Sequence, residues 1–328
     1  MKMPGARIAG AAVILAAAFT AAAIPAWPQS YPSRPIRLIV SFPPGGTGDI
    51  LGRIIAGQLS IELGQSFAVE NRSGAGGTIG ARDVAKAEPD GYTLTVGQTP
   101  EIAVNPYFMK DVGYDPRTDL QPIALAGVVP LALVVPANSP FSTVEQWVAA
   151  LRAKQPLTFA SAGIGTPGHI GGEMLKLKLD DKLIHVPYKG AGPAMNDVAG
   201  GQVDFYFPGY PAAVPLTQGG KVKLLAVTSA EPSPNAPNIP TVAAATGLPD
   251  FDFTLWAGFF GPRGMPTEIT SRLNAAINKV IVEPEVMARL QANGAEVRAL
   301  SIDQTAAFVQ TEIGKYQSII KAADIKPE

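Results

Sequence analysis

Short apolar runs and helical patterns alternate along the first third of the chain. Apolar runs at residues 36–42, 67–70 and 92–96 predict three strands. Helical spacing of the apolar side chains predicts helices over residues 49–64 and 79–87, between these strands. This β-α-β-α-β order is half of a doubly wound α/β sheet. In such sheets, ligands bind at the carboxyl ends of the strands.

The same alternation returns further along the chain and predicts a second α/β unit. Its predicted strands cover residues 131–135, 157–160, 183–186, 203–207 and 224–227. Residues 230–250 lack periodicity and predict a surface loop, and a strand-like run at residues 253–260 is followed only by helical patterns. Because this helical tail has too few strands to be a domain, we expect it to pack on the first unit.

That packing requires the chain to cross between the two units twice, near residues 131–136 and 253–260. Two lobes joined by two crossings can open and close like a clamshell. The expected division is residues 27–133 plus 255–328 for the first lobe and residues 134–254 for the second. Each lobe is expected to be a doubly wound α/β unit.

Residues 1–26 are typical of a secretory signal peptide. Lys2 and Arg7 precede an apolar, Ala-rich stretch at residues 8–23, and small residues follow this stretch. An uncleaved membrane anchor is the alternative, but this stretch is short for a membrane span, which needs about 20 apolar residues. We therefore expect export, cleavage and a periplasmic location.

The amino-acid composition limits the kinds of catalysis and ligand binding that the chain can support. The 328-residue chain has no cysteine, two histidines and a formal net charge of −1. The missing cysteine excludes disulfides and thiol catalysis, and the balanced charge gives no basic patch for nucleic acid. Two histidines without cysteine are poor material for a transition-metal site, so we expect neither a metal nor a cofactor.

Three predicted strand ends carry Gly-rich loops, at residues 41–49, 71–78 and 161–169. Backbone N–H groups and the positive end of a following helix favour an anion at such a corner. The third loop, Gly163-x-Gly165-x-x-Gly168, matches the dinucleotide fingerprint, but its place in the middle of an exported chain argues against a nucleotide. Residues 45–48 lack the Gly-Lys-Ser/Thr of a phosphate loop.

Catalytic groups are sparse. Ser161 has neither a Gly-x-Ser-x-Gly context nor an obvious base. His185 lies in an apolar strand and is expected to be structural, whereas His169, at a helix start, can cap the helix, contact a ligand or do acid–base work. Asp49 is most simply a first-turn helix residue, and Lys189 is either a ligand contact or a solvated turn residue. We therefore expect a binding protein and not an enzyme.

Several stretches resemble the periplasmic solute-binding receptors of the tripartite tricarboxylate transporter system, the Bug-type family. They are PIRLIVSFPPGGTGDILGR (35–53), VENRSGAGGTIGA (69–81), PDGYTL (89–94), VPYKG (186–190), GGQVD (200–204), PTV (240–242) and WAGFFGP (256–262). The resemblance implies a type II periplasmic-binding-protein fold and a carboxylated ligand. One carboxylate would be held by the Phe42–Asp49 and Gly76–Ile79 loops of the first lobe, largely through backbone groups and bridging waters.

Carried onto this chain, the resemblance and the loop pattern give a set of expected ligand-binding residues. They are Phe42, Pro44, Gly45, Gly46, Thr47, Asp49, Gly76, Gly77, Thr78 and Ile79 in the first lobe, and Ser161, Gly163, Thr166, His169, Tyr188, Lys189, Asp204 and Phe207 in the second. Where the family often has small residues and an acid after Asp204, this chain has Phe205-Tyr206-Phe207. Strand alternation puts Phe205 and Phe207 on one face and Tyr206 on the other, and the aromatic run favours an aromatic carboxylate as one candidate ligand.

The expected function is capture of a small carboxylate, either a di- or tricarboxylate or an aromatic one, between two lobes. The expected partners are the carboxylate and the membrane permease subunits of a tripartite transporter, and the receptor is expected to be monomeric. A signalling receptor and an exported α/β enzyme that uses a carboxylate side chain are the alternatives.

Overall fold

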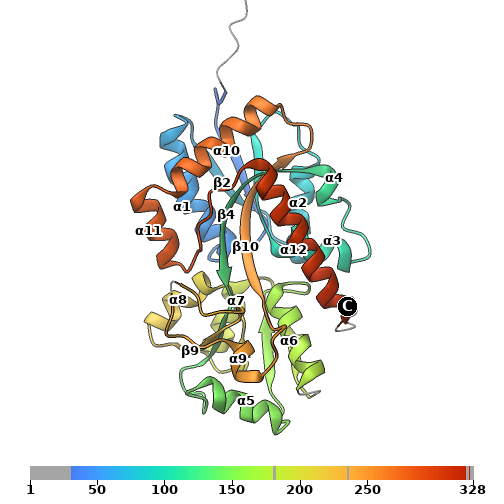
Figure 1. Ribbon diagram of the computed structural model, residues 1–328, viewed down its shortest axis with the longest axis vertical. Helices are drawn as coiled ribbons and strands as arrows, with labels where there is room; N and C mark the ends of the chain where they lie inside the picture. Colours follow the sequence, from blue (N-terminus) through green and yellow to red (C-terminus); the bar gives the residue numbers. More distant parts are fainter. Residues whose placement is uncertain (1–30, 180–181, 235, 323–324, 326–328) are drawn as a thin grey trace, which may run out of the picture. The chain divides into compact units, whose positions relative to one another are not determined.

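Two five-stranded sheets organise the chain (Figure 1). The first has the order β2 (Phe67–Asn71), β1 (Ile36–Val40), β3 (Thr93–Gln98), β10 (Thr254–Pro262), β4 (Leu120–Pro130). The second has the order β7 (Ile184–Pro187), β6 (Thr158–Ser161), β8 (Phe205–Tyr206), β5 (Ala132–Pro136), β9 (Val222–Val227). Helices lie between the strands in both, which confirms the predicted class of two α/β lobes.

The helices follow the strands closely in the sequence. They are α1 (Thr47–Glu62), α2 (Thr78–Ala85), α3 (Asn105–Phe108), α4 (Pro116–Asp119), α5 (Val144–Arg152), α6 (Pro167–Lys178), α7 (Ala191–Ala199), α8 (Tyr210–Gln218), α9 (Val242–Thr246), α10 (Thr267–Ile281), α11 (Pro284–Ala292) and α12 (Ile302–Ala322). Two short helical segments, η1 (Ala75–Gly77) and η2 (Pro100–Val104), precede α2 and α3.

The computed structural model describes residues 31–179, 182–234, 236–322 and 325. The predicted signal peptide, residues 1–26, lies outside the described residues. Within the described ranges, no helix combines the length and apolar character that a membrane crossing requires.

Parallel pairing decides where the loops gather. In the first sheet β1 is parallel to both β2 and β3, with Ile36 opposite Phe67 and Arg37 opposite Thr93. In the second sheet β6 is parallel to both β7 and β8. Because the carboxyl ends of parallel strands share one edge of a sheet, the loops that enter α1 and α2 lie together, and so do those that enter α6, α7 and α8.

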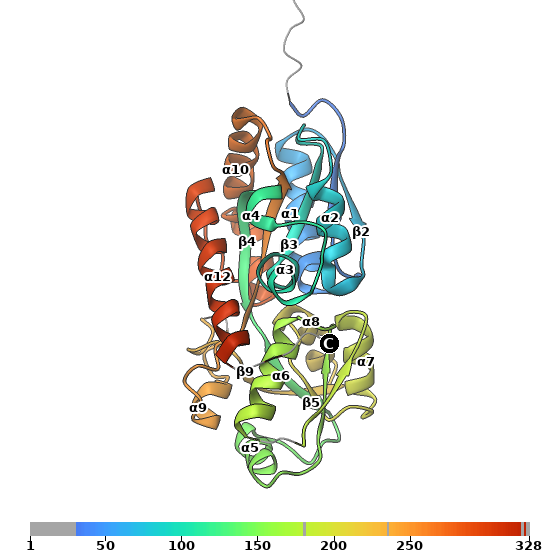
Figure 2. The same cartoon turned by 90° about the vertical axis from the view of Figure 1, so that its right-hand side faces the viewer.

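The C-terminal helices pack on the first lobe, as the shortage of strands in the tail led us to expect. Helices α10 and α12 contact β4 (Figure 2), and α11 contacts α1 (Figure 1). On α12, Tyr316 is fully buried, and its hydroxyl donates a hydrogen bond to the carbonyl oxygen of Thr254 at 2.8 Å.

Two segments differ from the sequence predictions. Strand β4 was not predicted, because Pro122, Gly127 and Pro130 interrupt its apolar pattern; its pairing with β10 accommodates them with two register shifts. The surface loop expected at residues 230–250 is partly wrong, since it contains α9. That helix begins with a side-chain cap, in which Thr241 Oγ1 accepts a hydrogen bond from Ala244 N at 3.1 Å.

Thr228 joins the two crossing segments. Its hydroxyl oxygen accepts from Leu131 N at 3.0 Å and donates to the carbonyl oxygen of Phe253, and its own backbone bonds Leu131 and Phe253 as well. Leu131 lies between β4 and β5, and Phe253 directly precedes β10. Both segments that cross between the two sheets are thus hydrogen-bonded to Thr228, which is fully buried. The lobe boundaries that we expect, at 133/134 and 254/255, stay a prediction.

Replacing Thr228 with Val should destabilise the protein, because the change keeps the shape of the side chain but leaves a buried N–H and a buried carbonyl without their partner. The free energy of unfolding should fall by about 1–3 kcal/mol in urea titrations. The matched control is Thr311→Val, since Thr311 lies on the exposed face of α12 and bonds only its own helix at Ala307 O. Equal stability of the two variants would contradict the role of Thr228.

Candidate functional site

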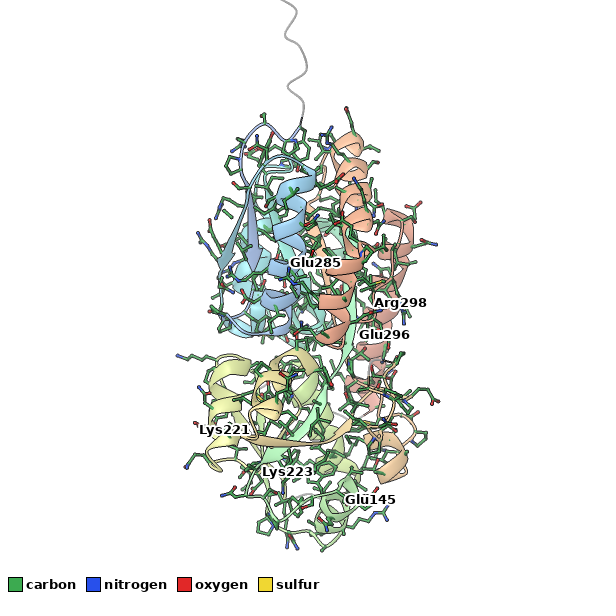
Figure 3. The ribbon with its side chains drawn as sticks, turned by 90° about the vertical axis from the view of Figure 1, so that its left-hand side faces the viewer. Glu145, Lys221, Lys223, Glu285, Glu296 and Arg298 are labelled. Atoms are coloured by element: carbon green, nitrogen blue, oxygen red, sulfur yellow. The ribbon has the colours of Figure 1, made fainter. Side chains whose placement is uncertain are left out.

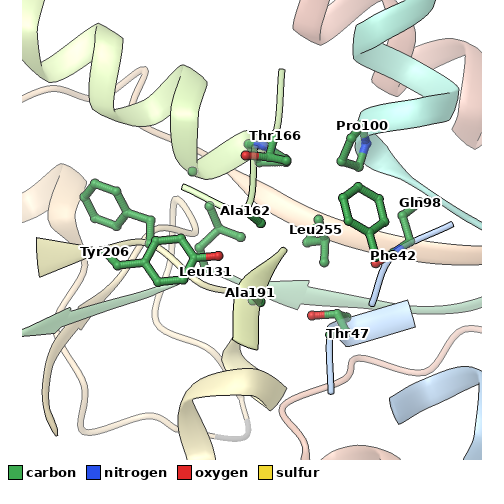
Figure 4. A pocket seen from close by; sticks show the side chains of 15 residues that line it. Phe42, Thr47, Gln98, Pro100, Leu131, Ala162, Thr166, Ala191, Tyr206 and Leu255 are labelled. Carbon is green, nitrogen blue, oxygen red and sulfur yellow. The ribbon is translucent and has the colours of Figure 1, made fainter. Parts of the chain in front are cut away.

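A cavity lies between the loop edges of the two sheets (Figure 4). It is lined by Phe42, Gly46, Thr47, Gln98, Pro100, Leu131, Ala162, Thr166, Pro167, Gly168, Ala191, Tyr206, Phe207, Gly209 and Leu255. The space open to the centres of water molecules is about 40 Å³. The empty space inside it, including space open to solvent, is about 450 Å³.

Four helices begin at this cavity. Gly46 is the N-cap of α1, Thr166 that of α6 and Gly209 that of α8, and Ala191 is the first residue of α7. None of these four N-termini has a side-chain cap hydrogen bond. The first N–H groups of a helix have no partner inside the helix, and they carry the positive end of its dipole. The cavity is therefore electropositive through backbone groups.

Charged side chains do not line the cavity within the described part of the chain. The labelled residues in Figure 3, such as Glu285 in the first lobe and Glu145 and Lys221 in the second, are not among its lining residues. The polar side chains at the cavity are neutral: Thr47, Gln98, Thr166 and Tyr206. An anion bound here would meet hydrogen-bond donors and helix dipoles, but no cation.

Gln98, at the end of β3, is the polar residue that the sequence analysis missed. Its Oε1 accepts a hydrogen bond from Gly48 N at 2.9 Å, which fixes the orientation of the amide. Its Nε2 is buried and has no hydrogen-bond partner among the described residues. An N–H donor that is oriented, buried and unsatisfied at a cavity is costly unless a ligand accepts from it. A glutamine outside the Gly-rich loops gave no signal in the sequence.

In the first lobe, the structure brings Phe42, Gly46 and Thr47 to the cavity, and not Asp49. The Asp49 carboxylate instead accepts from Gly45 N at 3.0 Å, from Arg53 Nε at 2.8 Å and from Asn71 Nδ2 at 3.0 Å. It therefore holds the loop in shape from behind. Pro44 and Gly45 also lie outside the cavity lining.

The second Gly-rich loop supports the first. Gly76, Gly77, Thr78 and Ile79 do not line the cavity. At Gly77, where φ is +91°, an added methyl group would lie 2.8 Å from the ring of Phe42, so the loop packs directly behind that ring. Asn105 Nδ2 donates to the carbonyl oxygen of Gly76 at 2.7 Å and holds the loop in place.

In the second lobe, Thr166 and Phe207 line the cavity, and so does Tyr206, which is not in the expected set. The predicted alternation is confirmed: the rings of Phe205 and Phe207 pack edge-on against Trp147 in the core, at 5.2 and 6.1 Å, whereas Tyr206 belongs to the other face of the sheet. The Phe207 ring thus serves the core, and of this aromatic run it is the Tyr206 ring that lies at the cavity (Figure 4).

The remaining expected residues of the second lobe lie outside the cavity lining. They are Ser161, Gly163, His169, Tyr188, Lys189 and Asp204. Tyr188 donates its hydroxyl to Asp197 at 2.6 Å, and Asp204 accepts from Thr158 N at 2.8 Å, so both secure the lobe itself. Lys189 is exposed.

Glycines allow the lobes to approach closely around the cavity. A methyl group on Gly209 would overlap Thr47 Oγ1, and one on Gly190 would lie 2.7 Å from the ring of Pro43. Gly165 likewise faces the side chain of Asn105 without room for a Cβ atom. The closed arrangement therefore depends on glycine at these cross-lobe contacts.

Gly209→Ala should hinder closure without harming the fold, because Gly209 has φ −57° and alanine adopts that backbone freely. The clash with Thr47 should cost about 1–3 kcal/mol in the closed state alone. Ligand affinity should then fall roughly 10- to 100-fold in calorimetry, while the melting temperature of the ligand-free protein changes little. Gly192→Ala is the control, since nothing lies within 4 Å of a Cβ atom at Gly192; equal affinities would refute the contact.

Glu101 is a fully buried carboxyl group in η2, behind the first-lobe loops. Its Oε1 accepts from Gln98 N at 3.0 Å. Burial raises the pKa of Glu101 from 4.5 to about 8, so the folded protein keeps this group protonated at neutral pH.

The raised pKa of Glu101 predicts how stability changes with pH. The unfolded chain ionises Glu101 near pH 4.5 and the folded chain near pH 8, so its stabilising contribution is complete below 4.5 and lost as pH rises to 8. Glu101→Gln should remove this decline, which amounts to up to about 5 kcal/mol of unfolding free energy. Urea titrations from pH 4.5 to 8.5 test this, with the exposed Glu268→Gln as control; parallel profiles for Glu101→Gln and wild type would contradict it.

The fold and the cavity together define a two-lobed solute-binding protein. The family model described as "Tripartite tricarboxylate transporter family receptor" matches residues 51–325. The chain belongs to this family of periplasmic receptors, which confirms the resemblance found in the sequence.

Curated relatives agree with this assignment. Protein BugT of Bordetella pertussis is 33% identical over 306 residues, covering 93% of this chain and 94% of BugT. A Pseudomonas protein from the tcbD–tcbE intergenic region is 38% identical over 293 residues, covering 89% of this chain and 87% of that protein.

Solved structures agree as well. An R. palustris protein solved with adipate has a TM-score of 0.86 at 35% identity, over 91% of this chain and all of that one. MatC from Rhodopseudomonas palustris, solved with bound malate, has a TM-score of 0.81 at 33% identity, over 88% of this chain and all of that one.

Proposed function

We propose that this protein is a periplasmic receptor that captures a small carboxylate between its two lobes and delivers it to a tripartite tricarboxylate-type permease. The candidate ligands are di- and tricarboxylates and aromatic carboxylates. The adipate and malate in the two related structures are supporting cases of the same chemical class. We further propose export by cleavage of the leader at residues 1–26, and a monomeric, non-enzymatic receptor.

The observation that carries this proposal is the convergence of four helix N-termini on one cavity without a charged side chain among its described lining residues. Each N-terminus stabilises a nearby anion by about 0.3–1 kcal/mol at exposed sites and by up to about 2 kcal/mol when partly buried. Together they favour an anion at a cavity whose described lining has no lysine or arginine. Backbone N–H groups also match the two oxygens of a carboxylate.

Within the expected set, Phe42, Gly46, Thr47, Thr166 and the backbone of Phe207 remain our proposed ligand contacts, because they line the cavity. To them we add Gln98 on the first lobe and Tyr206 on the second. Their amide and hydroxyl groups approach the cavity from opposite lobes (Figure 4). The other expected residues support these contacts from behind or face away.

Closure is the proposed mechanism of capture. The ligand contacts both lobes, residues 27–133 plus 255–328 on one side and residues 134–254 on the other. These contacts are complete only when the lobes are closed. A ligand that bridges them therefore shifts the population towards the closed state. In the closed cavity, Leu131, Leu255 and Phe42 surround the apolar part of the ligand.

A panel of carboxylates tested by calorimetry on the mature protein should yield at least one saturable ligand, and Gln98→Glu should weaken its binding roughly 10- to 100-fold at pH 8. The variant keeps an oxygen for Gly48 N but replaces the Nε2 donor with a negative charge that repels the carboxylate. Gln98→Met, which removes the donor without adding charge, should weaken binding less.

The control for this substitution is Gln146→Glu. Gln146 also accepts a backbone hydrogen bond, from Ser142 N at 2.7 Å, but it is exposed on α5 and outside the cavity. The proposal fails if no carboxylate binds while an amine or sugar does. Unchanged affinity in Gln98→Glu would remove Gln98 from the site.

A further inference from the structure

Both histidines of the chain lie together with Glu173 in the second lobe. His169 and Glu173 are four residues apart on α6, which places them on the same face of the helix, and His185 lies on β7. One ligating atom from each of the three residues lies within 4.8 Å of the others. The two imidazole rings are stacked, with centroids 4.3 Å apart and an interplanar angle of 28°.

Each imidazole is oriented through one nitrogen and leaves the other nitrogen unused. His169 Nδ1 accepts from Gly165 N at 3.1 Å, and His185 Nε2 shares a hydrogen bond with Ser161 Oγ at 2.7 Å. The remaining nitrogens, His169 Nε2 and His185 Nδ1, are buried and have no hydrogen-bond partner among the described residues. A metal-binding histidine commonly donates its other ring N–H to a second group. His185 can do so towards Ser161 Oγ, whereas His169 Nδ1 accepts a hydrogen bond and would have to become a donor.

Glu173 supplies the negative charge of the cluster. The carboxylate of Glu173 is paired with Lys176 Nζ at 3.7 Å. The Lys176 side chain is 40% exposed and can turn into solvent when a divalent cation takes its place.

We propose that His169, Glu173 and His185 form a binding site for a divalent transition-metal ion of the zinc type, separate from the carboxylate cavity. Zinc bonds to nitrogen and carboxylate oxygen of about 2.0–2.2 Å place tetrahedral ligands roughly 3.3 Å apart, so the side chains must close in by rotation. Three protein ligands leave a fourth position for water. This proposal does not rest on the proposed function, and it revises the expectation that two histidines give no metal site.

Binding at His169 Nε2 has a structural consequence. Because Nδ1 now accepts from Gly165 N, the proton of the neutral ring is on Nε2. A metal at Nε2 moves that proton to Nδ1 and breaks the Gly165 hydrogen bond. Gly165 lies in the loop between Ala162 and Thr166, which both line the cavity. Metal loading should therefore change the carboxylate affinity of the receptor.

The test uses the mature protein without a histidine tag, because the only imidazoles are then His169 and His185. Zn²⁺ calorimetry at pH 7.5 should show one saturable site per chain, and Co²⁺ should give the visible absorption of a four-coordinate ion. Glu173→Gln and His185→Ala should each lower Zn²⁺ affinity at least 10-fold. The control is Glu145→Gln, an exposed glutamate in the first turn of α5.

His185→Ala also loses the Ser161 contact, so its fold is checked by circular dichroism; Glu173, whose side chain is 19% exposed, offers the variant that perturbs the core less. Absence of stoichiometric Zn²⁺ binding by the wild-type protein overturns the proposal. Zn²⁺ affinity in Glu173→Gln equal to that of wild type overturns it as well.

Discussion

The direction of four helices decides what this receptor can bind. Helices α1, α6, α7 and α8 each follow a strand, and the strands β6, β7 and β8 before the last three are parallel to one another. Parallel strands end at the same edge of the sheet, so the helices that follow them begin there too. The positive ends of their dipoles then meet at one cavity. The anion site that we propose is thus a product of topology, and it contains no basic side chain among the described lining residues.

The absence of charge from the described cavity lining has a further consequence. A buried cation would require a partner in the empty receptor, and breaking that pair on ligand entry would cost several kcal/mol. Backbone N–H groups avoid this cost because they are fixed and carry only partial charge. The remaining polar groups that we propose as ligand contacts, such as Gln98 and Tyr206, are neutral. In the proposed function, release of the ligand then requires only that the lobes open.

Part of this account could be predicted from the sequence and part could not. The strand–loop–helix corner at residues 41–49 has a strong local signal, and the alternation of Phe205, Tyr206 and Phe207 followed from the period of a strand. The position of Gln98 depends on the pairing of β3 with β1. This pairing places the Gln98 side chain within hydrogen-bond distance of Gly48. Local patterns contain no information on such pairing. For the same reason, the approach of His185 to α6 could not be foreseen.

The central claim is that backbone dipoles, without a cation, hold the carboxylate. The most direct test compares a carboxylate ligand with its uncharged primary amide, for example adipate with adipamide, by calorimetry over a range of salt concentrations. The account predicts at least 10-fold tighter binding of the carboxylate, with an affinity that depends only weakly on salt because the site is buried. Equal binding of the amide, or a steep loss of carboxylate affinity with salt, would contradict it.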